Sequence, residues 1–475
     1  MNSSEHRLSR TTQIAVGALL LILLVGCTVG PNYKRPQVPT ATTYRGADGA
    51  EVATADKASL GDENWAEVFR EPELQDLIRT ALKDNYDVRI AAQRVLEQQA
   101  QVRITRSQQF PTLSIGGTGI GAEVPDSLSS TVGGSTISAG SFNLSAAWTP
   151  DFWGLYRRQT EAARAQLLSQ VWAQRAVRMT LIEQVATAYI QLRALDRQLA
   201  IAKQTLQTRQ QSVDLTRRLA DGGSAPLSDL RQAEELQYTA SSQIPQLEQQ
   251  IQQQENAIRL LLGQNPGTVA HTDESALAPP PQDLPVGLPS HLLERRPDIL
   301  QAEQQLVAAN AQIGVARAQF FPQLSISASG GVGGDDWNNL FDPSSHLVYG
   351  IGSLTQPLFE GGKLRGQLQL SQHTRDELVL NYQKTISGAF RDVSDALIAH
   401  DKQRAAREQQ TLLVAAAQDA TRLARTRYQG GATSYLEVLT TDSDLFSAQL
   451  NLVNAQEGEA LSLVQLYGAL GGGWE

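Results

Sequence analysis

Short segments with apolar residues at every second position are the first pattern in the chain. One such segment places four apolar residues between small polar ones: Phe142, Leu144, Ala146 and Trp148. This period of two is typical of a strand with one apolar and one polar face. Four strands are expected, at about 112–123, 137–151, 323–333 and 346–358. Each is close to the ~9–11 residues with which a tilted strand crosses a bilayer.

The second pattern is a heptad seam in two long stretches without proline. In the first stretch apolar residues are spaced alternately by four and three: Leu181, Val185, Ala188, Leu192, Leu195, Leu199, Ala202 and Leu206. In the second, Ile386, Phe390, Val393 and Leu397 do the same. Left-handed coiled coils have this spacing. Helices are therefore expected at about 155–220 and 362–428. A Gly-Gly turn and a partner helix follow each one, at about 226–262 and 434–469, which makes two long αα-hairpins.

The chain is an internal duplication. Asp87 to Gly119 matches Asp298 to Gly330 at an offset of 211, including a shared Phe-Pro-x-Leu-Ser-Ile motif, and later positions match at an offset of 208. Each copy begins with a helical stretch, at about 73–108 and 297–320. The expected divisions are a signal peptide (1–26), an N-terminal extension (27–72), repeat 1 (73–263), a linker (264–296), repeat 2 (297–471) and a short tail (472–475). Two copies form a pseudo-symmetric pair, because a solenoid needs three or more.

The first 26 residues have the pattern of an export signal, with Arg7 and Arg10 before an apolar core. The segment ends Leu-Val-Gly-Cys27, which resembles a bacterial lipobox, where the cysteine carries the acyl anchor. Thr28 stands where inner-membrane lipoproteins typically have aspartate, so the resemblance implies transfer to the outer membrane. An accidental cysteine at the end of an apolar core is the alternative.

Composition argues against an enzyme and against nucleic-acid binding. The formal net charge is -9 and no run of basic residues occurs, so a phosphate-binding surface is not expected. The single cysteine excludes a disulfide framework and a cysteine-based zinc cluster. The six histidines are scattered, and no serine lies in a G-x-S-x-G elbow. We therefore expect no catalytic residues, no metal and no cofactor.

The strand count predicts assembly with other subunits. Four strands cannot close a transmembrane barrel, which needs at least about eight, and open sheet edges are not tolerated in lipid. The subunits must then share one barrel. The alternative is a soluble protein that carries two hairpins.

Several motifs together resemble the outer-membrane factor family, the TolC-like channels of tripartite efflux systems, and its lipidated branch. The lipobox is followed by Gly30-Pro31-Asn32-Tyr33-Lys34-Arg35-Pro36, the Phe-Pro-x-Leu-Ser motif is repeated, and the chain closes Leu-Tyr-Gly-Ala-Leu-Gly-Gly-Gly-Trp474. The resemblance implies a mainly α fold with transmembrane β: a homotrimer with a shared twelve-stranded β-barrel in the outer membrane and a periplasmic α-barrel tunnel. It implies a passive exit duct for drugs or other small molecules. Its partners would be a periplasmic adaptor, an inner-membrane pump of the RND type and outer-membrane lipid.

The resemblance also implies a gate where the hairpins turn. Asp229 and Glu437 match each other in the two repeats, and Glu437 falls where the family has a pore-constricting acid. Tyr428 matches a tyrosine that latches onto the acid of the other repeat, here Asp229. Thr440 and Thr433 depart from the aspartate and the arginine of many relatives, and Asp442 or Asp444 could compensate. The adaptor would dock at the turns, which contain two glycine pairs: Gly222, Gly223, Gly430 and Gly431.

The sequence leaves four alternatives open, two for single residues and two for the whole chain. Ser434-x-x-Glu437 has the spacing of a capping box, in which Glu437 only satisfies a helix start. Tyr428 could be an ordinary helix-surface tyrosine. The whole chain could be a lipidated coiled-coil adaptor, which has no need of membrane-length strands, or a trimeric surface adhesin, which has no need of a duplicated strand-helix unit.

We predict acylation at Cys27, because this only cysteine directly follows Gly26 at the end of the apolar core. Several acyl chains anchor durably at ~0.8 kcal/mol per buried CH₂. Intact mass spectrometry of the mature protein should show the loss of residues 1–26 and an added acyl mass. Cys27→Ser should weaken membrane attachment, and a mature mass without an acyl increment would contradict the assignment.

Overall fold

The structure is a computed structural model that describes residues 28–39, 42–49, 51–52, 59–123, 125, 136–270, 284–334 and 339–474. The expected signal peptide and Cys27 lie outside the described residues. The chain divides into two compact units: the described parts of 1–36, 95–170 and 302–382 form unit 1, and the described parts of 37–94, 171–301 and 383–475 form unit 2.

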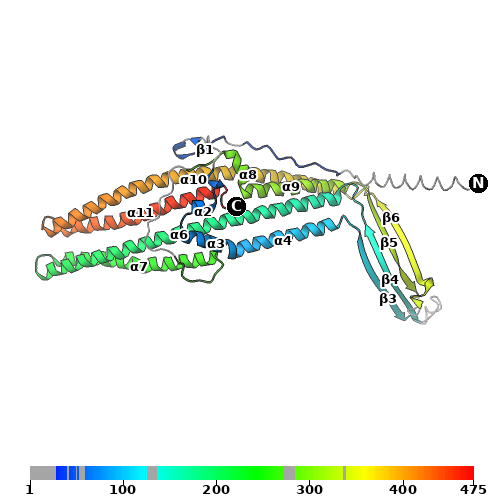
Figure 1. Ribbon diagram of the computed structural model, residues 1–475, viewed down its shortest axis with the longest axis horizontal. Coiled ribbons are helices and arrows are strands. Elements are labelled where there is room, and N and C mark those ends of the chain that lie inside the picture. Colours follow the sequence, from blue (N-terminus) through cyan, green and yellow to red (C-terminus); the bar gives the residue numbers. More distant parts are fainter. Residues whose placement is uncertain are drawn as a thin grey trace, which may run out of the picture. The chain divides into compact units, whose positions relative to one another are not determined.

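Unit 1 contains one antiparallel sheet of four strands in the order β3-β4-β5-β6 (Figure 1). The strands are β3 (Thr112–Glu123), β4 (Thr136–Trp148), β5 (Gln323–Gly334) and β6 (His346–Thr355). Because β4 pairs with β5, strands from both repeats belong to the same sheet. The second and fourth strands end earlier than expected, just before Pro150 and Pro357, since proline has no N–H for the ladder.

The register divides the sheet into two different faces. Ser145 lies opposite Ser114 on one side and Ser329 on the other, and its hydroxyl is 3.1 Å from that of Ser114. On the other face Leu144 lies opposite Ile115 and Gly330. The apolar side chains are uncovered in the single chain, with Ile115 77% exposed. A continuous uncovered apolar face marks a surface for lipid or a partner.

The residues after the lipobox form a strap, residues 28–36, that lies on the helices of unit 1. Arg158 is buried and donates to the carbonyl oxygens of Val29 and Gly30, at 3.3 Å each, and to the Asn32 side chain at 2.9 Å. Arg35 forms an ion pair with the buried Glu303 of repeat 2. The strap therefore contacts helices from both repeats.

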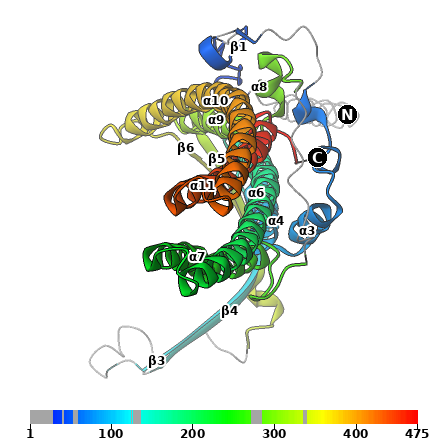
Figure 2. The same cartoon turned by 90° about the vertical axis from the view of Figure 1, so that its left-hand side faces the viewer.

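Unit 2 contains most of the two helical hairpins (Figures 1 and 2). They are formed by α6 (Leu155–Asp221) with α7 (Leu227–Leu261), and α10 (Lys363–Gln429) with α11 (Tyr435–Ala469). The predicted seam is buried, since Val185, Leu192 and Val393 have no exposed surface. Of the helices that the structure describes, none is both long and apolar enough to be a membrane span.

The first helical stretch differs from the sequence expectation. It is two helices, α3 (Pro72–Asp84) and α4 (Tyr86–Ser107), where a single helix at about 73–108 was predicted. The break occurs at Asn85, whose side chain accepts from the N–H groups of Asp87 and Val88, at 2.7 and 3.2 Å, and donates to the Leu261 carbonyl. Asn85 therefore caps the second helix and holds it against the end of α7. In repeat 2 the matching stretch is α9 (Pro297–Ala318).

The extension and the linker supply parts of the unit 2 core. Trp65 begins the short helix α2 (Trp65–Val68), and Phe69 directly follows it. Both side chains pack with the seam residues and with Tyr467 of α11. Ser59 bridges Val286 of the linker, which is therefore only partly irregular. Small elements complete the described part of these segments: β1 (Tyr44–Arg45), β2 (Glu51–Val52), α8 (Leu292–Arg295) and short 3₁₀ turns.

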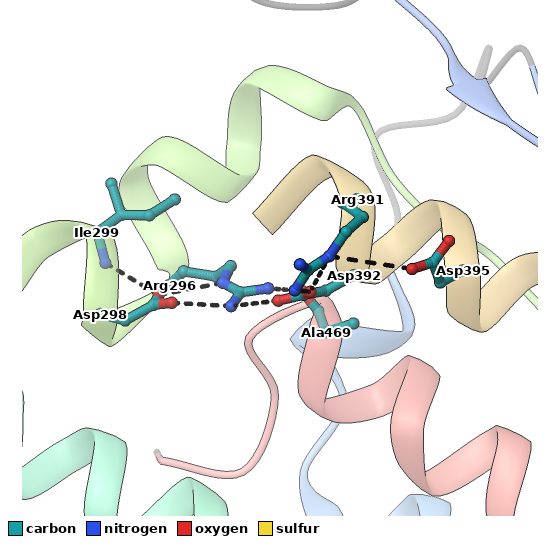
Figure 3. A network of polar contacts seen from close by, with 7 residues as sticks. All are labelled: Arg296, Asp298, Ile299, Arg391, Asp392, Asp395 and Ala469. Atoms are coloured by element: carbon teal, nitrogen blue, oxygen red, sulfur yellow. Dashed lines mark hydrogen bonds and ion pairs between the residues drawn. The ribbon is translucent and has the colours of Figure 1, made fainter. Parts of the chain in front are cut away.

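Arg296, just before α9, joins the first turn of α9 to α10 and α11 within unit 2 (Figure 3). Its guanidinium donates two hydrogen bonds to Asp298, at 3.0 and 2.8 Å, one to Asp392 of α10 at 3.2 Å, and one to the Ala469 carbonyl of α11 at 3.0 Å. The planar fork of arginine suits this arrangement. Because Ala469 is the last residue of α11, the arginine also satisfies a carbonyl that the helix leaves unpaired.

A half-buried carboxyl group lies close to this network. Burial raises the pKa of Glu183 to about 7, although Arg296 acts in the opposite direction. Glu183 lies against Gly468 so closely that a Cβ added there would be 1.7 Å from Oε1. A larger residue at position 468 would therefore displace the Glu183 side chain from its place beside the helix.

We predict that Glu183→Gln makes the protein more stable at pH 8 than the wild type, with little change at pH 4. The native site keeps its proton up to about pH 7, whereas the unfolded chain loses it near ~4.3. The free energy of unfolding therefore falls as pH rises between these values, by roughly 1–3 kcal/mol. Thermal unfolding at the two pH values tests this, with the exposed Glu235→Gln as control. Equal melting shifts at both pH values would contradict it.

Candidate functional site

The hairpin turns have the same backbone geometry in the two repeats. Gly223 and Gly431 have φ angles of +69° and +71°, the left-handed conformation that ends many helices. The Ser224 N–H donates to the Leu219 carbonyl at 2.8 Å, and the Ala432 N–H donates to the Arg427 carbonyl at 2.8 Å. An added Cβ at either glycine would meet nothing within 4 Å, so the backbone angle is what requires glycine.

The structure brings Tyr428 and Asp229 together across the two hairpins. The tyrosine hydroxyl donates to the Asp229 carboxylate at 3.4 Å, which is long for this kind of bond. The Tyr428 ring packs edge-on against Tyr435 at 5.2 Å and belongs to a small apolar cluster with Val213 and Val438. Burial and the Asp229 carboxylate raise the pKa of Tyr428, so the phenol keeps the proton that it donates.

Glu437 has partners that the sequence did not suggest. Its carboxylate accepts from Arg427 at 2.8 Å and from the Thr433 hydroxyl. Ser434 is the N-cap of α11, but its side chain makes no capping hydrogen bond. The capping-box interpretation is therefore wrong. Arg427 lies in the last turn of α10, so the ion pair joins the end of this helix to the first turn of α11.

Thr440 and Asp444 are exposed, whereas Asp442 is buried. The Thr440 hydroxyl donates to the Leu436 carbonyl of its own helix at 3.0 Å, and the residue is exposed. Asp444 is exposed as well. Asp442 is buried in an ion pair with Arg209 at 2.8 Å and in another with Arg425. Asp442 is therefore not a free surface acid that could replace the missing aspartate at position 440.

Unit 1 contains a hollow of about 700 Å³ with an uncharged lining. Glutamine and alanine dominate its wall, which consists of residues from four helices: Gln98, Gln101, Thr105, Gln108, Gln159, Ala162, Ala163, Gln166, Gln305, Ala308, Ala309, Gln312 and Leu378. Such a wall offers many weak hydrogen-bonding groups and no fixed charge. Within the described ranges, no cluster of His, Cys, Asp or Glu could hold a metal ion.

Comparison with known proteins identifies the family. The sequence model of the outer membrane efflux protein family matches residues 77–264 and 288–472, one match for each repeat. The protein therefore belongs to the outer membrane efflux protein family and is an outer-membrane component of efflux, as its resemblance implied. The two matches correspond to the duplication found in the sequence.

Curated relatives match almost the full length. The chain is 36% identical over 463 residues to the probable efflux pump outer membrane protein TtgC of Pseudomonas putida, covering 96% of this chain and 95% of the relative. It is 34% identical to the outer membrane protein OprJ of Pseudomonas aeruginosa, covering 98% and 97%. It is 33% identical to the cation efflux system protein CusC of Escherichia coli, covering 96% and 97%.

Solved structures show the same fold. A membrane protein from Pseudomonas aeruginosa superimposes with a TM-score of 0.86 at 32% identity, covering 94% of this chain and 98% of that chain. CusC superimposes with a TM-score of 0.83 at 31% identity, covering 94% and 100%. The open state of the Neisseria gonorrhoeae MtrE outer membrane channel superimposes with a TM-score of 0.84 at 29% identity, covering 94% and 99%.

Proposed function

We propose that three copies of this chain form a passive exit duct, with a shared twelve-stranded β-barrel in the outer membrane and a helical tunnel in the periplasm. The observation that carries this proposal is the sheet of unit 1, which is open at both β3 and β6. In hydrocarbon, each unpaired backbone group costs several kcal/mol. Pairing of β6 with β3 of the next copy would satisfy every edge.

The two faces of the sheet support the same arrangement. In a closed barrel the Leu and Ile face would meet lipid, and the Ser and Asn face would line the water-filled interior. Three copies of four strands fit a barrel of twelve. An adaptor or an adhesin would have no use for a membrane-length sheet with this polarity.

Cargo and partners follow from the family and from the uncharged hollow. Relatives carry names for antibiotic, toluene, solvent and cation efflux. We propose that this duct passes drugs or other small molecules, delivered by an RND-type inner-membrane pump through a periplasmic adaptor that docks at the Gly222-Gly223 and Gly430-Gly431 turns. A glutamine-lined wall would bind no charge type strongly, which suits a duct that leaves selection to the pump.

The hairpin turns are proposed as the periplasmic gate. Tyr428 and Asp229 would hold the two hairpins of each subunit together in the closed state. Glu437 and Thr440 would lie near the threefold axis, where a ring of carboxylates favours cations. The Arg427 ion pair lowers the negative charge of that ring. That one relative has been solved in an open state supports a gate that moves.

We predict that the purified protein is a trimer in detergent, because an isolated subunit would place two bare strand edges in the micelle interior. Mass photometry and gel mobility before and after heating measure the assembly. A folded, stable monomer in detergent would contradict the shared barrel.

A second prediction concerns the gate. Tyr428→Phe combined with Asp229→Ala should raise single-channel conductance in planar bilayers, because it removes three interhairpin contacts per trimer. Each contributes ~0.5–1.5 kcal/mol net. The exposed Tyr238→Phe is the control for loss of a tyrosine hydroxyl and should leave conductance unchanged. Wild-type conductance in the double variant would remove this contact from the gate.

A further inference from the structure

The duplication preserves one ion pair near each hairpin turn. In repeat 1, Arg217 of α6 pairs with Glu234 of α7 at 3.3 Å. In repeat 2, Arg425 of α10 pairs with Asp442 of α11. Both residues of the second pair lie 208 positions after those of the first, which is the offset of the turns themselves. Each hairpin therefore has its own internal bond between its two helices.

The pair of repeat 2 has a third member from the other hairpin, whereas the third member in repeat 1 is Arg231 of α7 itself, 2.7 Å from Glu234. Arg209 of α6 donates to Asp442 at 2.8 Å, to the Leu236 carbonyl of α7 at 2.7 Å, and stacks on the Phe446 ring of α11 at 5.0 Å. The position that matches Arg209 in repeat 2 is Ala417. Repeat 2 therefore has no equivalent of Arg209. The contact of Arg209 with Asp442 joins one hairpin to the other, as the contact of Tyr428 with Asp229 does at the tip.

The Arg209–Asp442 ion pair is more deeply buried than the Arg217–Glu234 ion pair. The Arg209 and Asp442 side chains are 3% and 8% exposed, whereas Arg217 is 51% exposed. Exposed pairs contribute little to stability because water and salt screen them. In a buried pair, separation of the partners leaves an uncompensated charge, which is strongly unfavourable. Separating the hairpins at this level is therefore harder than separating the partners of the exposed pair.

We propose that Arg209 and Asp442 form a brace that positions the α10–α11 hairpin against the α6–α7 hairpin and so opposes opening of the gate. The brace rests on the proposed gate function. Arg209 lies 13 residues before Gly222, or ~20 Å along the helix at 1.5 Å per residue. The part of each hairpin between the brace and the turn can then move about the brace, and the contact of Tyr428 with Asp229 holds this part closed. Arg209 and Asp442 are positioning residues and do not contact cargo.

The first test is Arg209→Met, which removes the brace without leaving a lone buried charge. Asp442 keeps Arg425 as its partner, and methionine can still pack on Phe446. In the control variant Arg217→Met, Glu234 likewise keeps Arg231. In planar bilayers Arg209→Met should show an open probability roughly tenfold higher than the wild type, a shift of ~1.4 kcal/mol. Arg217→Met, which breaks only an internal pair, should behave as the wild type.

The second test restores the brace covalently, so that a merely structural effect of the substitution is separated from positioning. The double variant Arg209→Cys with Asp442→Cys should also open more often than the wild type. A short bifunctional thiol reagent that links the two cysteines should return the open probability toward wild type, and reduction should raise it again. The control is Arg217→Cys with Glu234→Cys, where the same linkage lies within one hairpin and should change nothing.

The outcomes separate this inference from the proposed function. If Tyr428→Phe with Asp229→Ala raises conductance while Arg209→Met and the linkage do not, the brace is refuted and the gate remains. If none of the trimers conducts in any variant, the exit-duct proposal itself fails. If linkage of residues 217 and 234 closes the channel as well as linkage of 209 and 442, a general stiffening explains the effect and the brace is refuted.

Discussion

The pairing of backbone groups at the sheet edges is the constraint on which the rest of the structure depends. Lipid offers no hydrogen bonds, so a strand that enters it must be paired on both sides. Among the described residues, the sheet of unit 1 has four strands, and its outer strands β3 and β6 are each open on one side. If copies of this chain pair β6 with β3 of the next copy throughout, both edges of every copy are satisfied only in a closed ring, as in the proposed barrel.

Because the chain is duplicated, the sheet and the helical hairpins are built from two copies of the same set of elements. Each repeat supplies two strands and one long hairpin, and strands of both repeats meet at the pairing of β4 with β5. The contacts between the two hairpins are made by residues that differ between the copies. Tyr428 has Ala220 as its counterpart, and Arg209 has Ala417. Contacts between the hairpins arise where the copies diverged, whereas contacts within a hairpin, such as Arg217 with Glu234, occur in both.

The strands and long helices were predictable because their patterns are local and repeated. A period of two or a heptad seam extends over many residues, so one exception does not obscure it. The exact ends of the helices and the partners of single side chains could not be predicted from such patterns. The break at Asn85 depends on a carbonyl of α7, far away in the sequence. The role of Glu437 depends on Arg427, and the spacing from Ser434 pointed to a cap that does not form. The family resemblance correctly paired Tyr428 with Asp229, which spacing alone could not do.

A gate must stay closed without its partner and still open when the partner binds, and the burial of its contacts decides whether both are possible. The tip contact is long and partly exposed, so an adaptor could replace it with contacts of its own at little net cost. The pair of Arg209 and Asp442 is buried, so water cannot replace either partner until the helices have already separated. The weak contact of Tyr428 with Asp229 would therefore let the end of each hairpin move. The buried pair of Arg209 and Asp442 would keep the two hairpins in place farther from the turn. In the proposed gate, this region would therefore provide both the part that moves and the contact that resists the movement.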